Sequence, residues 1–174
     1  MTRFACLILF LATIPVANWM IGNVGTVCIP KGPCLIPVAP GLMAPSGVLL
    51  IGIALVLRDA VHEYFGPKIA AAAIVIGAGL SAFVAPAPLV VASGVAFLLS
   101  ELADMAVYTP LRRKRLVTAV LASGVVGSIV DSAVFLWIAF GSLDYLTGQV
   151  VGKTWMTVGA AAWLWWRRKR MIVG

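Results

Sequence analysis

Charged residues are scarce in this sequence. Only 11% of its 174 residues are Asp, Glu, Lys or Arg, whereas 62% are hydrophobic. Soluble proteins contain about 25% charged and 45–50% apolar residues. A soluble fold of this length cannot bury so much apolar surface, whereas lipid solvates the outer faces of membrane helices. The shortage of charge therefore excludes an ordinary soluble domain and indicates an integral membrane protein.

Histidine is also scarce, and motifs of hydrolytic enzymes are missing. The chain has one histidine, His62, and no thiol cluster lies near it, so we expect no metal site. The stretch from Gly148 to Thr154 resembles a phosphate-binding loop, but three residues separate its glycines where the motif needs four. We therefore expect no cofactor and no enzymatic activity. The two glycines would instead allow close packing of a helix.

The three cysteines occur in two different settings. Cys6 lies in the first apolar segment, where a thiol behaves as a small hydrophobe. Cys28 and Cys34 flank a turn-rich stretch. A disulfide between them is chemically allowed if this loop faces an oxidising compartment such as the periplasm. The sequence alone leaves the bond open.

Apolar segments of membrane-spanning length recur along the chain. One transmembrane helix needs about 20 apolar residues. We expect a single all-α transmembrane domain over residues 1–174, built as a six-helix bundle. Its helices are predicted at about 4–21, 46–65, 67–85, 88–109, 116–140 and 148–166. The stretch between the first two helices holds five prolines, and we expect an irregular outer loop that packs back over the bundle.

Basic residues give the bundle a direction. Eight of the thirteen Lys and Arg residues fall in two runs, 112–115 and 167–170. Cytoplasmic loops of membrane proteins carry the excess of Lys and Arg. Placing the first run inside makes both termini cytoplasmic and leaves only Lys31 and Lys153 toward the outside. We predict a multi-pass protein of the bacterial inner membrane, N-in and C-in. We expect it to contact the lipid bilayer and not to bind nucleic acid.

Five of the six acidic residues interrupt apolar segments. One ionised acid at the centre of a membrane helix costs roughly 2.5–3.5 kcal/mol, and a whole protein is stable by only about 5–15 kcal/mol. These acids must therefore face the bundle interior, where they pair, take up a proton or contact a polar cavity. They are Asp59, Glu63, Glu101, Asp104 and Asp131.

Helical spacing gathers the acids on few helix faces. Asp59 and Glu63 are four residues apart, and Glu101 and Asp104 are three apart, so each pair shares a face. Asp131 lies midway along the fifth segment. We interpret these acids as a polar binding site between the second, fourth and fifth helices.

Three motifs, taken together, are similar to those of a known family. They are Arg58-Asp59-x-x-x-Glu63-x-x-Gly66, Ala96-Phe97-x-x-Ser100-Glu101-x-x-Asp104-x-x-x-Tyr108 and Ser128-x-x-Asp131-Ser132-x-x-Phe135, preceded by Ala17-Asn18. Over about residues 15–140 the chain resembles the queuosine precursor transporters, also known as the vitamin uptake transporters. The Cys28–Cys34 loop and Arg58 depart from the commoner pattern, which leaves the exact substrate open.

The resemblance implies import of 7-deazaguanine-type bases for salvage into tRNA modification. A carboxylate can accept both N–H donors of a guanine-like edge in charge-assisted bonds, and aromatic rings can stack on the base. The substrate-binding residues expected from this resemblance are Glu101, Asp104 and Asp131, with contributions from Asp59, Glu63, Phe97, Ser100 and Asn18.

Other interpretations stay open at this stage. The acids could join helices only, for example through Arg58 and Asp104. The chain could be a substrate-binding subunit that docks on a separate ATP-driven module. An intramembrane enzyme could pair Asp104 with Asp131, although no feature supports it, and a scaffold without transport would not need five buried acids. The oligomeric state, including a homo-oligomer, and the energy coupling are not readable.

Overall fold

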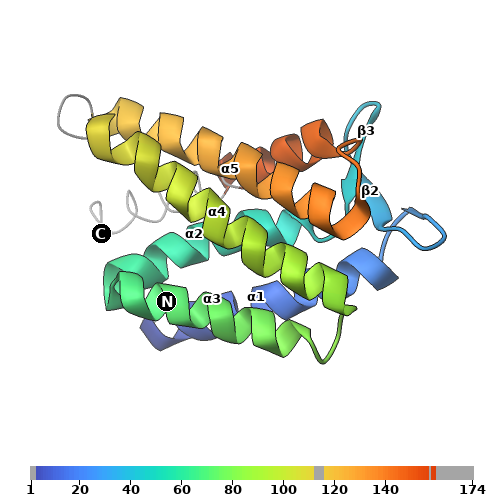
Figure 1. Cartoon of the computed structure of the whole chain (residues 1–174), viewed down its shortest axis with the longest axis horizontal. Coiled ribbons are helices and arrows are strands. Elements are labelled where there is room, and N and C mark those ends of the chain that lie inside the picture. The colour runs from blue at the N-terminus through green and yellow to red at the C-terminus, as the bar shows by residue number, and fades with distance from the viewer. Residues whose placement is uncertain (1–2, 112–115, 157, 160–174) are drawn as a thin grey trace, which may run out of the picture.

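The structure, a computed structural model, describes residues 3–111, 116–156 and 158–159. Residues 146–156 form a helix that follows α5, and it is called the 146–156 helix below. Residue 157 and residues 160–166 of the predicted sixth segment, as well as the basic runs 112–115 and 167–170, lie outside the described residues. The labelled helices are α1 (Arg3–Asn23), α2 (Val48–Phe65), α3 (Pro67–Ser81), α4 (Ala87–Leu111) and α5 (Leu116–Phe140) (Figure 1).

The described ranges contain three helices that are long and apolar enough to cross a membrane. They cover Arg3–Asn23, Ala87–Leu111 and Ala122–Phe140. The 18 residues of α2 include Arg58, Asp59 and Glu63, and α3 has 15 residues, fewer than the roughly 20 of a full span. The protein is thus mainly helical and has the long apolar helices of a membrane protein.

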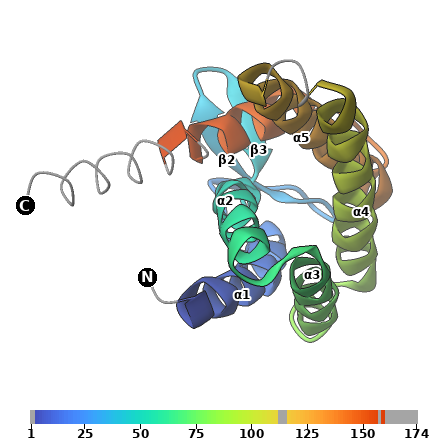
Figure 2. The ribbon, with the colours of Figure 1, turned by 90° about the vertical axis from the view of Figure 1, so that its left-hand side faces the viewer.

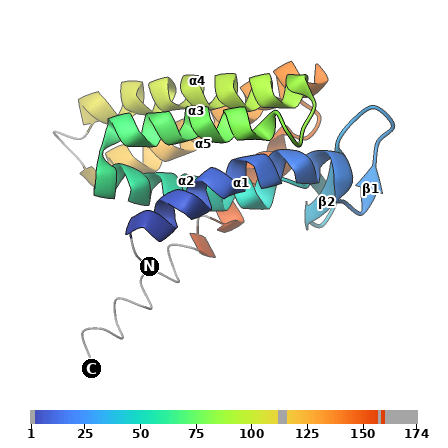
Figure 3. The same ribbon diagram turned by 90° about the horizontal axis from the view of Figure 1, so that it is seen from below.

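Consecutive helices run in opposite directions, so their connections gather at two ends of the molecule (Figures 1 and 3). The α2–α3 connection consists of one residue, Gly66. Its φ of +85° is favourable only for glycine. Pro67 then begins α3, where its missing N–H costs nothing. This glycine–proline pair lets α3 fold straight back beside α2.

The helices form two layers, each with its own core (Figure 2). In the first layer, Phe10 of α1 packs with Val61 of α2 and Ala73 of α3. In the second layer, Ala92 of α4 packs with Leu136 of α5. Because α4 and α5 are both 25 residues long, they can pair along their whole length. The space between the layers is where a site can form.

The prediction of an irregular loop between the first two helices is wrong. The segment instead forms an antiparallel three-stranded sheet in the order β1-β2-β3. Its strands are β1 (Val27–Cys28), β2 (Cys34–Ala39) and β3 (Leu42–Pro45). The expectation that this segment packs onto the bundle is confirmed, because Leu35 and Ala44 are buried there.

The prolines misled the sequence interpretation because each lies where a sheet tolerates one. Pro37 lies at a register shift in β2, where ladder hydrogen bonding is already interrupted. Pro45 ends the edge strand β3. Pro40 precedes Gly41, whose φ of +72° turns the chain between β2 and β3. Proline content alone therefore could not distinguish a loop from a short sheet.

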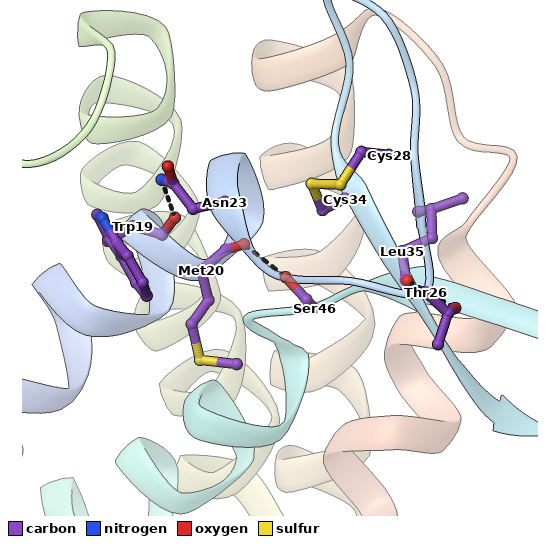
Figure 4. The surroundings of a disulfide bond; sticks show 8 residues. All are labelled: Trp19, Met20, Asn23, Thr26, Cys28, Cys34, Leu35 and Ser46. Carbon is purple, nitrogen blue, oxygen red and sulfur yellow. Dashed lines mark hydrogen bonds between the residues drawn. A yellow bond between two sulfur atoms is a disulfide. The ribbon is translucent and has the colours of Figure 1, made fainter.

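The sheet is fastened to itself and to α1. Cys28 and Cys34, which are partners in the β1–β2 ladder, form a disulfide (Figure 4). The Ser46 hydroxyl, fully buried, donates to the carbonyl oxygen of Met20 at 2.8 Å. The Ser46 N–H donates to the Cys34 carbonyl at 2.9 Å. The end of α1 and the start of α2 are thereby joined through the sheet.

Glycines let the 146–156 helix pack closely against the rest of the fold. At Gly148 an added Cβ would overlap the backbone carbonyl of Met43 in β3. At Gly152 it would lie 3.0 Å from the Val48 side chain in α2. At Gly52 of α2 it would lie 2.6 Å from the Met156 Cβ. The two glycines of the false phosphate-binding motif thus serve helix packing.

Substituting Gly148 tests this packing. Gly148→Ala should lower the free energy of unfolding by about 1–3 kcal/mol, because the Met43 carbonyl cannot move away as a flexible side chain could. Gly79→Ala in α3 is the matched control, since nothing lies within 4 Å of its added Cβ. The control should be neutral or more stable by roughly 0.5–1 kcal/mol. Equal behaviour of the two variants in denaturant titrations would contradict the proposed contact.

Thiol counting tests the disulfide. The chain has three cysteines, of which Cys6 is free and buried. Denatured without reductant, the protein should take up one maleimide-linked polyethylene glycol, and three after reduction. The mass shift on a gel reports the number directly. Three labels before reduction would show that the sheet is not crosslinked in the cell.

Candidate functional site

A cavity lies between the two layers, with walls from every helix. Its volume is about 60 Å³ measured at the centres of water-sized spheres, whereas a single water needs ~10–15 Å³. The space can therefore hold several waters or a small ligand in their place. Most of its lining is apolar, and the polar side chains at its wall are Asn18, Ser93, Asp131, Gln149 and Lys153.

Aromatic rings form part of the apolar wall. Phe97 of α4 and Phe135 of α5 line the cavity from the second layer, and Phe10 of α1 lines it from the first. A mainly apolar pocket with a few placed polar groups is the usual form of a small-molecule site. Flat rings would gain most from such walls, because aromatic side chains can stack on them.

An ion pair dominates the polar wall. The Lys153 ammonium donates to the Asp131 carboxylate, joining the 146–156 helix to α5. Lys153 is only 1% exposed, and the Asp131 side chain is 13% exposed. A buried charge is tolerated only with a partner and with further hydrogen bonds. The Lys153 ammonium and the Asp131 carboxylate therefore stabilise each other in this buried position.

Serines complete this ion pair. The Lys153 ammonium also donates to the hydroxyl of Ser132 at 2.7 Å, and Ser132 is fully buried. The Ser132 hydroxyl donates in turn to the backbone carbonyl of Ser128 at 2.8 Å. The ammonium is thus held by two groups of the same helix, which fixes its position at the cavity wall.

Asn18 presents an unused donor to the cavity. The hydroxyl of Ser93 in α4 donates to Asn18 Oδ1 in α1 at 2.8 Å, which links the two layers. Asn18 is 2% exposed, and its Nδ2 has no hydrogen-bond partner among the described residues. A buried donor without an acceptor costs about 1–3 kcal/mol. A ligand acceptor in the cavity would remove that cost.

A second ion pair lies beside the cavity. Arg58 of α2 pairs with Glu101 of α4, and the guanidinium lies 5.9 Å from the ring centroid of Phe97. Arginine over an aromatic face is a favourable arrangement. Because α2 and α4 belong to different layers, this pair also crosses from one layer to the other. It is more exposed than the first pair, with side chains 17% and 31% exposed.

A comparison with known protein families finds one that is similar to this chain. Residues 81–166 match the family described as "Putative vitamin uptake transporter". No curated protein sequence and no solved structure matches the chain.

The family match covers the polar wall of the cavity. Four of the five polar residues, Ser93, Asp131, Gln149 and Lys153, fall within residues 81–166. Asn18 lies in the earlier part of the chain. The stretch that is similar to this family is thus the stretch that carries the Lys153–Asp131 ion pair.

The structure places only some of the residues predicted for substrate binding at the cavity. Asn18, Phe97 and Asp131 line the cavity. Glu101 is engaged by Arg58 rather than by the cavity. Asp104 lies against Gly127 of α5.

Ser100 does not line the cavity. Ser100, 5% exposed, donates from its hydroxyl to the Phe97 carbonyl at 2.8 Å. The side chains of Asp59 and Glu63 lie outside the described part of the structure. Asp131 is therefore the acid that the described structure brings to the cavity.

Sequence reasoning missed three polar residues of the wall. Lys153 was assigned to the outer side by charge bias, whereas it lies in the bundle interior. Gln149 and Ser93 are uncharged, so no cost of burial singled them out. One signal was available for Lys153: it lies well inside an apolar segment, where a lysine needs a carboxylate partner.

A double-mutant cycle tests the ion pair. Asp131→Asn leaves a buried ammonium without a counter-charge and should lower stability by about 3–5 kcal/mol. Adding Lys153→Met removes the stranded charge and should restore most of the loss, which gives a large coupling energy. Asp144→Asn, in an exposed turn, makes the same chemical change and should stay within about 0.5 kcal/mol of the wild type. Additive effects of the two substitutions in unfolding titrations would contradict a direct pair.

Proposed function

We propose that this protein imports a queuosine precursor, a 7-deazaguanine-type base, across the bacterial inner membrane. The vitamin uptake transporter family supports uptake of a small molecule through a membrane protein. The observation that carries the finer proposal is the cavity, in which one carboxylate and one ammonium stand beside aromatic walls.

The charged pair matches the hydrogen-bonding edge of a guanine-like base. That edge presents two neighbouring donors, the ring N–H and the 2-amino group, followed by a carbonyl oxygen. The Asp131 carboxylate can accept from both donors. The Lys153 ammonium, held beside it, can donate to the carbonyl oxygen. An adenine-like edge places a donor where Lys153 needs an acceptor, so it fits this pair poorly.

The apolar wall matches the faces of the base. Phe97 and Phe135 both line the cavity, and stacking of a base on an aromatic side chain is worth about 1–3 kcal/mol. Stacking holds a flat ring, and the charged pair sets its rotation within the plane. Both requirements are met by side chains of α4, α5 and the 146–156 helix.

The other acids have roles at the edge of the site in this proposal. The Arg58–Glu101 pair crosses from α2 to α4, so separating the two layers must break it. Glu101 and Asp104 would contact the substrate as it passes, and Asp59 and Glu63 would contribute or act as a gate. The Arg58 side chain then holds the layers together until a competing group reaches Glu101.

The proposed orientation completes the transport pathway. Six spans with both termini in the cytoplasm follow from the Lys and Arg bias. In this orientation the disulfide-closed sheet faces the periplasm, where such a bond is stable. The substrate would enter from the end of the bundle that carries the sheet and leave from the end that carries Gly66.

Salvage in living cells tests the function and its site. Cells that cannot make the precursor, and lack their own importer, should regain queuosine in tRNA when they express this chain and are fed the base. Glu101→Gln with Asp131→Asn should abolish this recovery, and so should Asp131→Asn with Lys153→Met, which leaves no stranded ammonium. Asp144→Asn should recover like the wild type at equal protein amount. Normal queuosine in either double variant would overturn the site.

Reconstitution separates an independent importer from a docking subunit. The purified chain alone, in vesicles, should take up the base without ATP or any other protein. Uptake that needs an added ATP-driven module would favour the substrate-binding subunit instead.

A further inference from the structure

We propose that the end of α4 forms a gate that closes the cavity toward Gly66, and that Arg58 of α2 keeps this gate closed by holding Glu101. The gate is the inner segment of α4, which consists of Glu101–Leu111. The inference rests on the proposed function, because an opening at this end is the exit of an imported molecule. It adds where the protein opens and which contact resists the opening.

The Arg58–Glu101 pair lies directly beyond the inner end of the cavity. α4 begins at the end of the bundle that carries the sheet and runs toward the end that carries Gly66 (Figures 1 and 3). The last residues to line the cavity in that direction are Leu55 of α2 and Phe97 of α4. The two charged residues follow them by three and four residues, respectively, which is about one helical turn. A molecule that leaves between α2 and α4 in this direction must therefore pass the ion pair.

Burial divides α4 at the same position. The buried residues of α4 all precede Glu101, and they are Leu89, Ala92, Ala96 and Ser100. From Glu101 to Leu111 no residue is buried by the described part of the structure. Apolar side chains in a bilayer gain little from facing another helix in place of lipid, and segments with few buried contacts open at the lowest free energy. The inner segment is therefore the part of α4 that moves most easily.

The outer part of α4 and its partner helix α5 are held by polar contacts. The Ser93 hydroxyl of α4 donates to Asn18 of α1 at 2.8 Å. Ser93 precedes Glu101 by eight residues, which corresponds to about 12 Å along a helix. On α5, Asp131 is held by Lys153 of the 146–156 helix. These contacts keep the outer part of the two helices in place when the inner segment moves.

Hydrogen bonds within the helices favour bending at this boundary. The Ser100 hydroxyl donates to the Phe97 carbonyl of its own helix at 2.8 Å. A serine that bonds to the backbone one turn earlier weakens a helix slightly and often bends it. In α5 the Ser132 hydroxyl donates to the Ser128 carbonyl in the same way, also at 2.8 Å. Each helix thus has a position that favours bending, and the inner segment of α4 starts directly after it.

Of the two ion pairs, the one at Arg58 is the easier to open. Its side chains are 17% and 31% exposed, against 2% and 13% for Lys153 and Asp131. Separating a buried pair leaves uncompensated charges without solvent, so the less buried pair separates at lower cost. The Arg58 guanidinium also lies 5.9 Å from the Phe97 ring centroid. Arg58 therefore contacts one turn of α4 at two points, which keeps the gate closed at rest.

Access of a thiol reagent tests the gate. Cys6→Ala with Leu55→Cys leaves one free thiol, at the inner end of the cavity, because Cys28 and Cys34 are bonded to each other. A small membrane-impermeant methanethiosulfonate is added to the cytoplasmic face in inside-out vesicles, or to the outer face in right-side-out vesicles. Adding Glu101→Gln should raise the labelling rate from the cytoplasmic face by about fivefold or more, because the open form becomes more populated. The rate from the outer face should stay within about twofold.

Asp144→Asn is the matched control for Glu101→Gln. It makes the same change from carboxylate to amide, but in an exposed turn outside the gate. Its labelling rate should equal that of the starting chain from both faces. An unchanged rate in Glu101→Gln would overturn the gate, and so would an equal rise from both faces.

Exchanging the charges distinguishes a gate contact from damage to the fold. Arg58→Glu with Glu101→Arg restores an ion pair and should return the labelling rate to within about twofold of the starting chain. A rate that stays as high as in Glu101→Gln would contradict a direct pair. Arg58→Lys keeps the charge but loses the planar contacts of arginine, so it should give an intermediate rate. If Glu101→Gln does not fold, Arg58→Lys decides the proposal, and a rate equal to that of the starting chain overturns it.

The labelling uses no substrate, so the gate and the import function fail separately. An unchanged labelling rate overturns the gate even where cells that express the chain regain queuosine. Failure of the wild-type chain to restore queuosine overturns the proposed import, whatever the labelling rates are.

Discussion

An ammonium inside a membrane protein requires a counter-charge, and this requirement organises the second half of the fold. Lys153 is 1% exposed, so its charge has no access to water and depends on Asp131 and Ser132. These groups lie on α5, so the 146–156 helix has one permitted rotation against it. That rotation also brings Gln149 to the cavity wall, one turn earlier on the same face. A single electrostatic constraint thus fixes a helix and places its polar side chains.

Close packing supplies the rest of the arrangement. Gly148 and Gly152 let the 146–156 helix approach β3 and α2 at backbone distance. Gly47 does the same between α2 and α1, where an added Cβ would lie 2.6 Å from the Ala17 carbonyl. Small residues at helix contacts are the usual solution in membranes, where apolar surface gives no driving force between helices. The cavity persists because these contacts keep the layers in register around it while Phe97 and Phe135 line it.

The sequence showed which charged side chains are costly to bury, but it did not show which residues pair with them. Asp131 was identified because a carboxylate midway along an apolar segment must find a polar environment. Its partner could not be read, because pairing depends on how α5 and the next helix rotate against each other. The same limit applies to Arg58, which was considered a partner of Asp104 and is held by Glu101. The sheet escaped prediction for a different reason: prolines at a register shift and at a strand end look like loop residues until the pairing is known.

The contact between Gly148 and the Met43 carbonyl has a consequence for biogenesis. The sheet belongs to the early part of the chain, and the 146–156 helix that packs on it is made later. The N-terminal part of a chain generally folds first during synthesis, so the sheet can form before this helix is made. Until then Asp131 has no ammonium beside it and the cavity has an open side. A nascent chain that ends before Lys153 would therefore leave the Asp131 carboxylate without its counter-charge.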